Sequence, residues 1–250
     1  MAKFSVVILT RNEEKNILDC LESIKGTDEI IVIDDNSKDR TEEVIKTFDK
    51  QIKIYKRALS GDFSAQRNFG LLKAKNEWVL FLDADERVPR ELFHKINSAL
   101  TDNKFDGFLI ERRDIMWGRE LKFGEAGNIK LLRFAKKNKG KWEGKVHEKW
   151  DIKGAVGELD NPLMHYPHQT ISEFLSEVSL YSTIRANELK QAGIKVSAID
   201  IILYPKLKFL LNYFVKLGFM DGLPGLTVAL MMSLHSFLVR SKLWLLNNKN

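Results

Sequence analysis

Residues 78–86 read WVLFLDADE, an apolar run that ends abruptly in carboxylates. Such a run is typical of a strand inside a parallel sheet, because that strand is covered on both faces. Two similar runs precede it, FSVVIL at 4–9 and EIIVI at 29–33, and segments with helical spacing lie between them. This alternation predicts an α/β fold in which a mainly parallel sheet lies between helices.

Polar residues follow each of these strands where it ends. Thr10 follows the first, Asp35 lies just after the second, and Asp83 and Asp85 close the third. Ligands of open parallel sheets bind beyond the carboxyl ends of the strands, so we expect one crevice here. Asp83 and Asp85 are spaced to share a divalent cation and its bound diphosphate, since Mg²⁺ and Mn²⁺ favour oxygen ligands.

Both acidic and basic residues near this edge also have simpler interpretations. Asp85 and Glu86 could instead cap the helix that follows Pro89. Arg67 lies in SAQRNFG at 64–70, on a predicted helix that points toward the same edge. It is either an ordinary surface arginine or a guanidinium that reaches phosphate.

Four segments in order resemble the signatures of a family 2 glycosyltransferase with the GT-A fold: VVILTRNEEKNI (6–17), EIIVIDDNSKDRT (29–41), AQRNFG (65–70) and WVLFLDADE. WEGKVHEKW (142–150) and LMHYPHQTISEFL (163–175) further resemble lipopolysaccharide-core glycosyltransferases of the WaaE/KdtX type. The resemblance implies a metal-dependent, inverting enzyme. It would move a hexose, expected to be glucose, from a UDP-sugar to lipopolysaccharide core or another cell-surface glycan.

The resemblance also implies roles for individual side chains in binding the nucleotide sugar. The implied nucleotide contacts are Thr10 and Glu13 near the nucleotide, Asp35 at the uracil, Arg67 at the base or diphosphate, and Asp83 at the ribose. Asp85 would bind the Mg²⁺ or Mn²⁺ that bridges the diphosphate.

The catalytic base is harder to place. The family often has an acidic pair 60 to 100 residues beyond the DxD motif, and this sequence has no adjacent acidic pair in that window. The best positional match is His147-Glu148. We expect Glu148 to be the base and His147 to shape the site or approach the metal, with Asp114 and Asp151 as rivals for the base.

Histidines and tryptophans in the second half give weaker signals. His165 and His168 flank a proline, which disfavours a helical i, i+3 presentation, so we expect ordinary loop residues rather than metal ligands. Trp117, Trp142 and Trp150 are either platforms for sugar rings or core residues, and nothing local decides between the two.

Charge is concentrated at the C-terminal end. The net charge is +6, and residues 199–250 combine six basic and two acidic residues with the longest apolar stretches. This favours an amphipathic helical extension on an anionic membrane surface over nucleic-acid binding. The alternatives are a helical cap on the core and a homodimer interface. The single cysteine, Cys20, excludes an intrachain disulfide and a Cys-rich zinc site.

We expect a nucleotide-sugar-binding part (1–115), an acceptor-binding and catalytic part of the same domain (116–195) and a basic apolar helical tail (196–250). The apolar run before Arg11 is too short for a signal peptide, which predicts a cytoplasmic protein at the inner face of the cytoplasmic membrane. Two other functions stay open. One is a nucleotidyltransferase, which usually has a glycine-rich phosphate loop after the first strand; it is disfavoured because TRNEEKN at 10–16 lacks glycine. The other is a non-catalytic, membrane-attached binding module.

Overall fold

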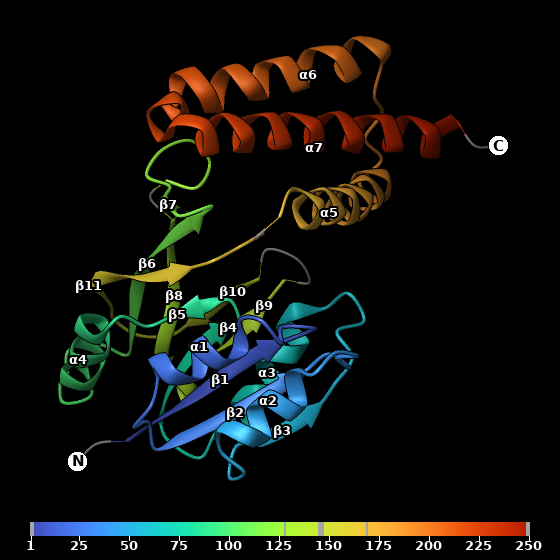
Figure 1. Cartoon of the computed structure of the whole chain (residues 1–250). Helices are drawn as coiled ribbons and strands as arrows, with labels where there is room; N and C mark the ends of the chain where they lie inside the picture. The colour runs from blue at the N-terminus through green and yellow to red at the C-terminus, as the bar shows by residue number, and fades with distance from the viewer. Residues whose placement is uncertain (1–2, 128, 145–147, 169, 249–250) are drawn as a thin grey trace. The chain divides into compact units, whose positions relative to one another are not determined.

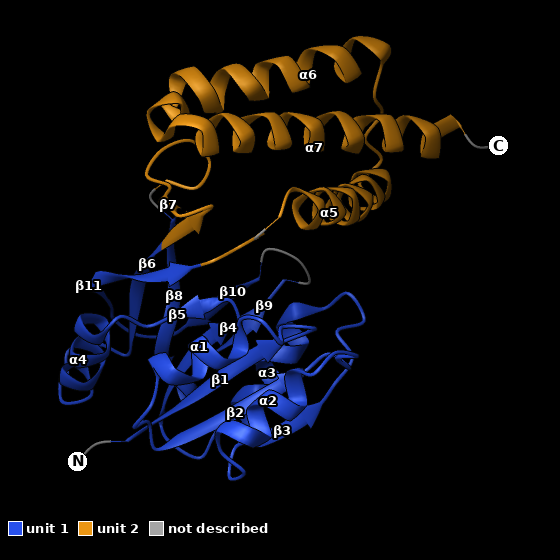
Figure 2. Ribbon diagram, viewed as in Figure 1, with its two compact units in different colours: residues 1–112, 129–165 blue, residues 113–128, 166–250 orange. Residues whose placement is uncertain are grey.

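The computed structural model describes residues 3–127, 129–144, 148–168 and 170–248 (Figure 1). The chain forms two compact units, which Figure 2 shows in different colours. The first contains residues 1–112 and 129–165, and the second contains residues 113–128 and 166–250. The units therefore interleave along the chain. The functional division at residues 115 and 195 stays a prediction.

The first unit alternates strands and helices, as the sequence predicts. Its elements are β1 (Phe4–Thr10), α1 (Ile17–Ser23), β2 (Glu29–Asp34), α2 (Thr41–Phe48), β3 (Lys53–Lys56), α3 (Phe63–Lys73), β4 (Trp78–Asp83), β5 (Glu86–Arg87), α4 (Arg90–Ala99), β6 (Gly107–Met116, which crosses into the second unit), β8 (Ile129–Lys136), a 3₁₀ turn (Lys137–Lys139), β9 (Gly140–Glu143), β10 (Lys149–Ile152) and β11 (Val156–His165).

Over the described residues the main sheet has the strand order β3-β2-β1-β4-β8-β6-β11-β5, with a short β7 beside β6. The first four strands are parallel, whereas β8 runs antiparallel to both β4 and β6. The register pairs Thr10 with Asp34 and Leu9 with Asp83. It therefore brings the polar ends of β1, β2 and β4 to one edge, which confirms the α/β fold.

Side chains alternate between the two faces of the sheet along each strand, and both faces are buried by the elements that cover them. Val6 and Ile8 of β1 face a cluster with α1, α2 and α4, while Val7 faces α3 and the β9–β10 hairpin. Helix α3 lies close to the sheet at Gly70, where an added Cβ would stand 2.5 Å from Cγ1 of Val7. Because this contact fixes the height of α3 above the sheet, it also positions Arg67 one turn earlier.

The second unit is mainly helical, as expected for the C-terminal part. It contains β7 (Arg119–Glu120), α5 (Ile171–Gln191), α6 (Ala198–Leu210), a π-helical turn (Leu211–Val215), a 3₁₀ turn (Gly218–Asp221) and α7 (Gly222–Asn248). Thr170 and Ser197 begin α5 and α6 with capping boxes that involve Glu173 and Asp200. Helix α7 packs against both α5 and α6 (Figure 1).

Candidate functional site

The carboxyl edge of the parallel strands is closed by backbone hydrogen bonds. The amide of Asp35 donates to the carbonyl of Thr10 at 2.9 Å, and the amide of Ala84 donates to the carbonyl of Leu9 at 3.1 Å. These bonds hold the turns after β2 and β4 against the end of β1. The Thr10 side chain is buried there, and its hydroxyl has no hydrogen-bond partner among the described residues.

Asp35 and Glu13 are tied to loops at this edge. Oδ1 of Asp35 accepts from the amide of Leu59 at 2.7 Å, and Oδ2 lies 3.1 Å from a guanidinium nitrogen of Arg11. The amide of Glu13 donates to the hydroxyl of Thr41 at 2.8 Å, which joins the entry of α1 to the start of α2. Their roles in nucleotide binding stay predictions.

Five charged side chains form one connected network beyond the end of β4. Arg67 donates to Asp83 and to Glu148, each at 2.9 Å. Arg133 donates to Asp83 at 2.7 Å and to Glu86 at 2.9 Å. Both guanidinium groups are buried. The structure therefore brings together Arg67, Asp83 and Glu148, which lie far apart in the sequence, and adds two residues that we did not anticipate.

Burial and the two arginines set the charge of the acids in this network. Burial alone would raise the pKa of Asp83, but Arg133 and Arg67 outweigh it and hold that pKa below its usual value. Burial raises the pKa of Glu86, and the opposing effect of Arg133 does not fully offset it. Asp83 is thus kept as an anion by two buried cations.

Helix α3 holds the β9–β10 hairpin through two adjacent residues. The Asn68 amide group donates to the carbonyl of Trp142 at 2.8 Å and accepts from its amide at 2.9 Å. The Arg67 guanidinium lies 4.7 Å from the Trp142 ring centroid and binds Glu148, just before β10. The position of Glu148 therefore depends on α3 as well as on the hairpin.

The tryptophans of this hairpin are core residues. Trp142 and Trp150 are paired across β9 and β10, with ring centroids 5.4 Å apart. Each ring centroid lies 5.1 Å from that of Phe81 on β4, and both side chains are buried. They are thus not platforms for a sugar. Trp117 lies in the second unit and packs against its hydrophobic cluster.

Asp85 lies beside a histidine that we expected to be an ordinary loop residue. Nε2 of His165 is 3.1 Å from Oδ2 of Asp85. Strand β11 pairs antiparallel with β5, and this register places His165 opposite Glu86. Burial alone would raise the pKa of Asp85, but His165 lowers it below its usual value. His168, by contrast, stacks on Phe174 in the second unit.

The capping interpretation of the acids after β4 is wrong. The first turn of α4 is preceded by Pro89, and no side chain caps it. Asp85 contacts His165 instead, and Glu86 accepts from the amide of Asp83 at 2.9 Å. Both acids therefore face the strand ends rather than the helix.

The residues at this edge fit a divalent cation that is shared with a ligand. Oδ2 of Asp85 and Nε2 of His165 lie 3.1 Å apart here, and each could supply one ligand. Among the described residues no group of three or more metal-binding side chains occurs, so phosphate oxygens and water would complete the coordination.

The other residues that were predicted for catalysis lie in different parts of the chain. His147 lies outside the described residues. Asp151 projects from the exposed face of β10, on the opposite side from Trp150, and Asp114 belongs to the second unit. Glu148 contacts the Arg67–Asp83 network through Nε of Arg67.

Sequence reasoning missed Arg133 and the ion-pair role of Glu86, and it placed His165 in a loop rather than a strand. Arg133 interrupts the largely apolar strand IKLLRFA at 129–135, and a charged residue at a buried position of a strand signals a buried partner. Glu86 follows the two aspartates directly, and the sequence suggests a role for it only as a cap of the helix after Pro89. For His165 the proline two residues later was the misleading signal, because the residue belongs to a strand.

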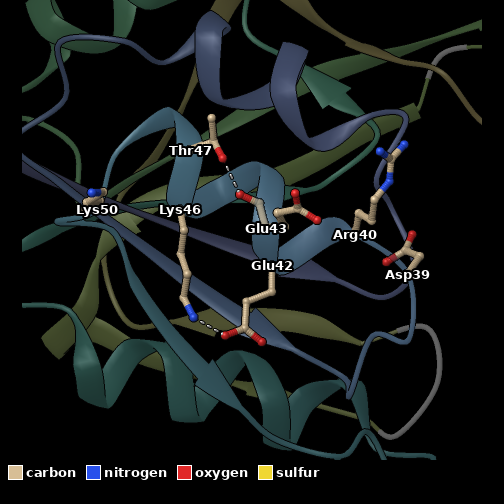
Figure 3. A pocket seen from close by; sticks show the side chains of 7 residues that line it. All are labelled: Asp39, Arg40, Glu42, Glu43, Lys46, Thr47 and Lys50. Atoms are coloured by element: carbon tan, nitrogen blue, oxygen red, sulfur yellow. Dashed lines mark hydrogen bonds and ion pairs between the residues drawn. The ribbon is translucent and has the colours of Figure 1, made fainter.

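A shallow depression on the outer side of α2 has a different character (Figure 3). It is lined by Asp39, Arg40, Glu42, Glu43, Lys46, Thr47 and Lys50. Lys46 donates to Glu42 at 2.6 Å, and the Thr47 hydroxyl donates to the backbone of Glu43. These polar groups satisfy one another along one helix, which is typical of a solvated helix face rather than a ligand site.

Removing the Arg133 cation is expected to destabilise the fold. In Arg133→Met, the fully buried carboxylate of Glu86 loses its cation, and we expect about 3–5 kcal/mol less free energy of unfolding. Urea-induced unfolding measures this loss. The double variant Arg133→Met, Glu86→Gln should recover part of it, because glutamine can still accept from the Asp83 amide. A loss below about 1 kcal/mol, the size of an exposed pair, would contradict the buried contact.

Residues 5–151, more than half of the chain, match the domain described as Glycosyl transferase family 2. The chain belongs to glycosyltransferase family 2. This confirms the resemblance and identifies the protein as a transferase. A family relative, the lipopolysaccharide core biosynthesis glycosyltransferase LpsC of Rhizobium meliloti, is 26% identical over 96% of this chain and 91% of that protein.

Two solved structures share the GT-A fold of this glycosyltransferase. Residues 1–349 of Staphylococcus aureus TarS, in complex with UDP-GlcNAc, have a TM-score of 0.50 and 19% identity, covering 94% of this chain and 81% of the TarS 1–349 chain. Glucosyl-3-phosphoglycerate synthase from Mycobacterium tuberculosis, in complex with Mn²⁺, UDP and phosphoglyceric acid, has a TM-score of 0.50 and 16% identity, covering 78% and 80%. At these identities the likeness concerns the fold.

Proposed function

We propose that this glycosyltransferase is a metal-dependent, inverting enzyme that transfers a hexose, glucose in the first instance, from a UDP-sugar. The acceptor would be lipopolysaccharide core or another cell-surface glycan. The observation that carries the proposal is the network of Arg67, Asp83 and Glu148 at the carboxyl edge of the sheet, next to the Asp85–His165 pair. The UDP-containing complexes of TarS and of the mycobacterial synthase support the donor, and the LpsC relative supports the acceptor class.

The donor would bind along the ends of β1, β2 and β4. Thr10 has a buried hydroxyl that can pair with the nucleotide, and Asp35 and Asp83 offer acceptors to the uracil and the ribose. Glu13 holds the loop beside Thr10. A bound Mn²⁺ or Mg²⁺ would be held by Asp85 and His165, and it would neutralise charge on the diphosphate.

Arg67 and Glu148 would carry the chemical step. Glu148 accepts the proton of the acceptor hydroxyl, whose oxygen forms the new bond to the anomeric carbon. The bond from that carbon to the diphosphate oxygen breaks, and its electron pair leaves with UDP. Arg67 contacts Glu148 and Asp83 in the absence of donor, and one of its terminal nitrogens has no partner among the described residues. That nitrogen can stabilise the growing negative charge.

The other functions are less well supported. A nucleotidyltransferase is disfavoured by the match over residues 5–151. A non-catalytic binding module would not need a candidate base held by a buried arginine, so the contact between Arg67 and Glu148 favours an enzyme. We place the enzyme in the cytoplasm, at the inner face of the cytoplasmic membrane where its acceptor would be made. A homodimer remains the alternative use of its apolar tail.

Calorimetric titration with UDP, GDP, CDP and TDP, each with and without Mn²⁺, tests the donor assignment. We expect UDP to bind most tightly and Mn²⁺ to raise its affinity at least tenfold, about 1.4 kcal/mol. Equal affinities for all four nucleotides would contradict the uracil contact. The absence of binding by any nucleotide would favour the non-catalytic module.

A further inference from the structure

Helix α6 exposes apolar side chains on one continuous face. The large side chains at positions i, i+3, i+4, i+8, i+11 and i+15 are between 46% and 71% exposed, and we call them the apolar stripe: Ile199, Ile202, Leu203, Leu207, Leu210 and Phe214. The spacing is that of one side of a helix. Exposed apolar side chains continue beyond the stripe, since Val215 in the π-helical turn is 72% exposed and Leu223 in α7 is 75% exposed. A soluble monomer rarely leaves so large an apolar patch open to water.

Positive charge accompanies the stripe. Lys195 precedes α6, Lys206 lies within the stripe and Lys216 follows it. All three are exposed, and none forms an ion pair within the part of the chain that the structure describes. The two acidic residues between 195 and 223 are bonded to other groups. Asp200 caps the start of α6, and the buried Asp221 accepts from backbone amides.

The opposite face of α6 is held in place by polar contacts. The hydroxyl of Ser233 on α7 donates to the carbonyl of Pro205 at 2.8 Å, and the guanidinium of Arg240 lies 3.7 Å from the Tyr204 ring centroid. Lys208 binds Glu125 at 2.8 Å. These contacts occupy the inner side of α6 and leave the apolar stripe outward, so a rotation that buried the stripe would break them.

Helix α7 is the other apolar helix of this unit. The segment Gly218–Asn248 is long and apolar enough to cross a membrane, by length and composition only. However, Lys242 donates to the carbonyl of Ser179 at 2.7 Å and to the hydroxyl of Ser182 at 2.8 Å, both on α5. A spanning α7 would lose these bonds to α5. The contacts therefore favour α7 as the support of α6.

We propose that the apolar stripe and its three lysines form a docking surface for an anionic bilayer, with α6 lying in the plane of the interface. The apolar side chains enter the acyl boundary, while the lysines reach the lipid phosphates. Lys206 extends from within the stripe to the headgroups, as long cationic side chains do at such interfaces. The inference rests on the proposed membrane location of the enzyme, and it names the surface responsible.

Vesicle binding of the full chain without donor or metal tests this surface. The chain is expected to bind phosphatidylcholine vesicles that contain phosphatidylglycerol, and to bind pure phosphatidylcholine more weakly. Leu207→Glu and Phe214→Glu should each reduce binding at least tenfold. Lys206→Ala and Lys216→Ala should each reduce it about fivefold, and only on anionic vesicles.

Matched controls come from the first unit. Leu72 is a highly exposed leucine on α3, and Lys50 is an exposed lysine after α2, so Leu72→Glu and Lys50→Ala should leave vesicle binding unchanged. Circular dichroism and UDP titration of each variant check that it is folded. UDP binding without vesicle binding would overturn the surface alone, whereas vesicle binding without UDP binding would overturn the donor assignment alone.

Two other results would overturn the proposal. If the stripe variants bind anionic vesicles like the wild type, another part of the chain contacts lipid. If the wild type is a stable dimer without lipid and Leu207→Glu converts it to a monomer, the stripe is an interface between two copies. Sedimentation velocity of both proteins in lipid-free buffer makes this distinction.

Discussion

Glu148→Gln is expected to lower kcat for hexose transfer by about 10²- to 10⁴-fold, the usual contribution of a general base. Glutamine has nearly the same size as glutamate, and its carbonyl oxygen can still accept from Nε of Arg67. The donor site should therefore keep its shape, and UDP affinity should change little. The measurement is steady-state transfer from a UDP-sugar to an acceptor glycan, with UDP binding followed separately by calorimetry.

The matched control for this variant lies on the same hairpin. Asp151→Asn removes an exposed carboxylate only three residues away and should leave kcat near the wild-type value. Asp114→Asn tests the other rival. A normal rate in Glu148→Gln, together with a large loss in either aspartate variant, would move the base. A large loss of UDP affinity in Glu148→Gln would instead assign Glu148 to donor binding through Arg67.

Asp85→Ala is expected to abolish the part of UDP affinity that depends on Mn²⁺. Even a side chain that only orients a metal ligand changes metal affinity 10- to 100-fold, so loss of the ligand itself should cost at least about 100-fold. UDP affinity measured without metal should stay the same. Calorimetric titration of UDP over a series of Mn²⁺ concentrations separates these two quantities.

His165→Ala completes the test of the cation site. It should also weaken the Mn²⁺ dependence, because the imidazole lies 3.1 Å from Asp85. Asp160→Ala is the control, since it removes a largely exposed carboxylate from β11, the strand that carries His165. If Asp85→Ala responds to Mn²⁺ like the wild type, the metal assignment is wrong even if the nucleotide still binds.

Much of the first unit could be predicted from local sequence. WVLFL at 78–82 lies within β4, and EIIVI at 29–33 lies within β2. Strands buried on both faces need continuous apolar runs, so each run predicts a buried strand without information from the rest of the chain. The resemblance of the strand-end motifs also indicated the family, which the match over residues 5–151 confirms.

The helix starts were predicted less well where long-range contacts decide them. The apolar spacing after β1 favours a helix from about residue 13, whereas α1 begins at Ile17, about one turn later. The preceding turn is occupied by bonds to a distant segment, because the amides of Glu13 and Glu14 donate to Thr41 and Asp39. The local sequence pattern cannot predict these hydrogen bonds, because their acceptors lie 25 or more residues away along the chain.

The alternation of strand and helix, the family and the acidic strand ends can all be predicted from the amino-acid sequence, because each depends on neighbours along the chain. Only the tertiary structure placed Arg133 between Asp83 and Glu86, and His165 beside Asp85, 80 residues away. These pairs depend on the antiparallel strands β8 and β11, whose partners are chosen by the whole sheet. A buried charge is stable only with such a partner, so its role is decided by the fold.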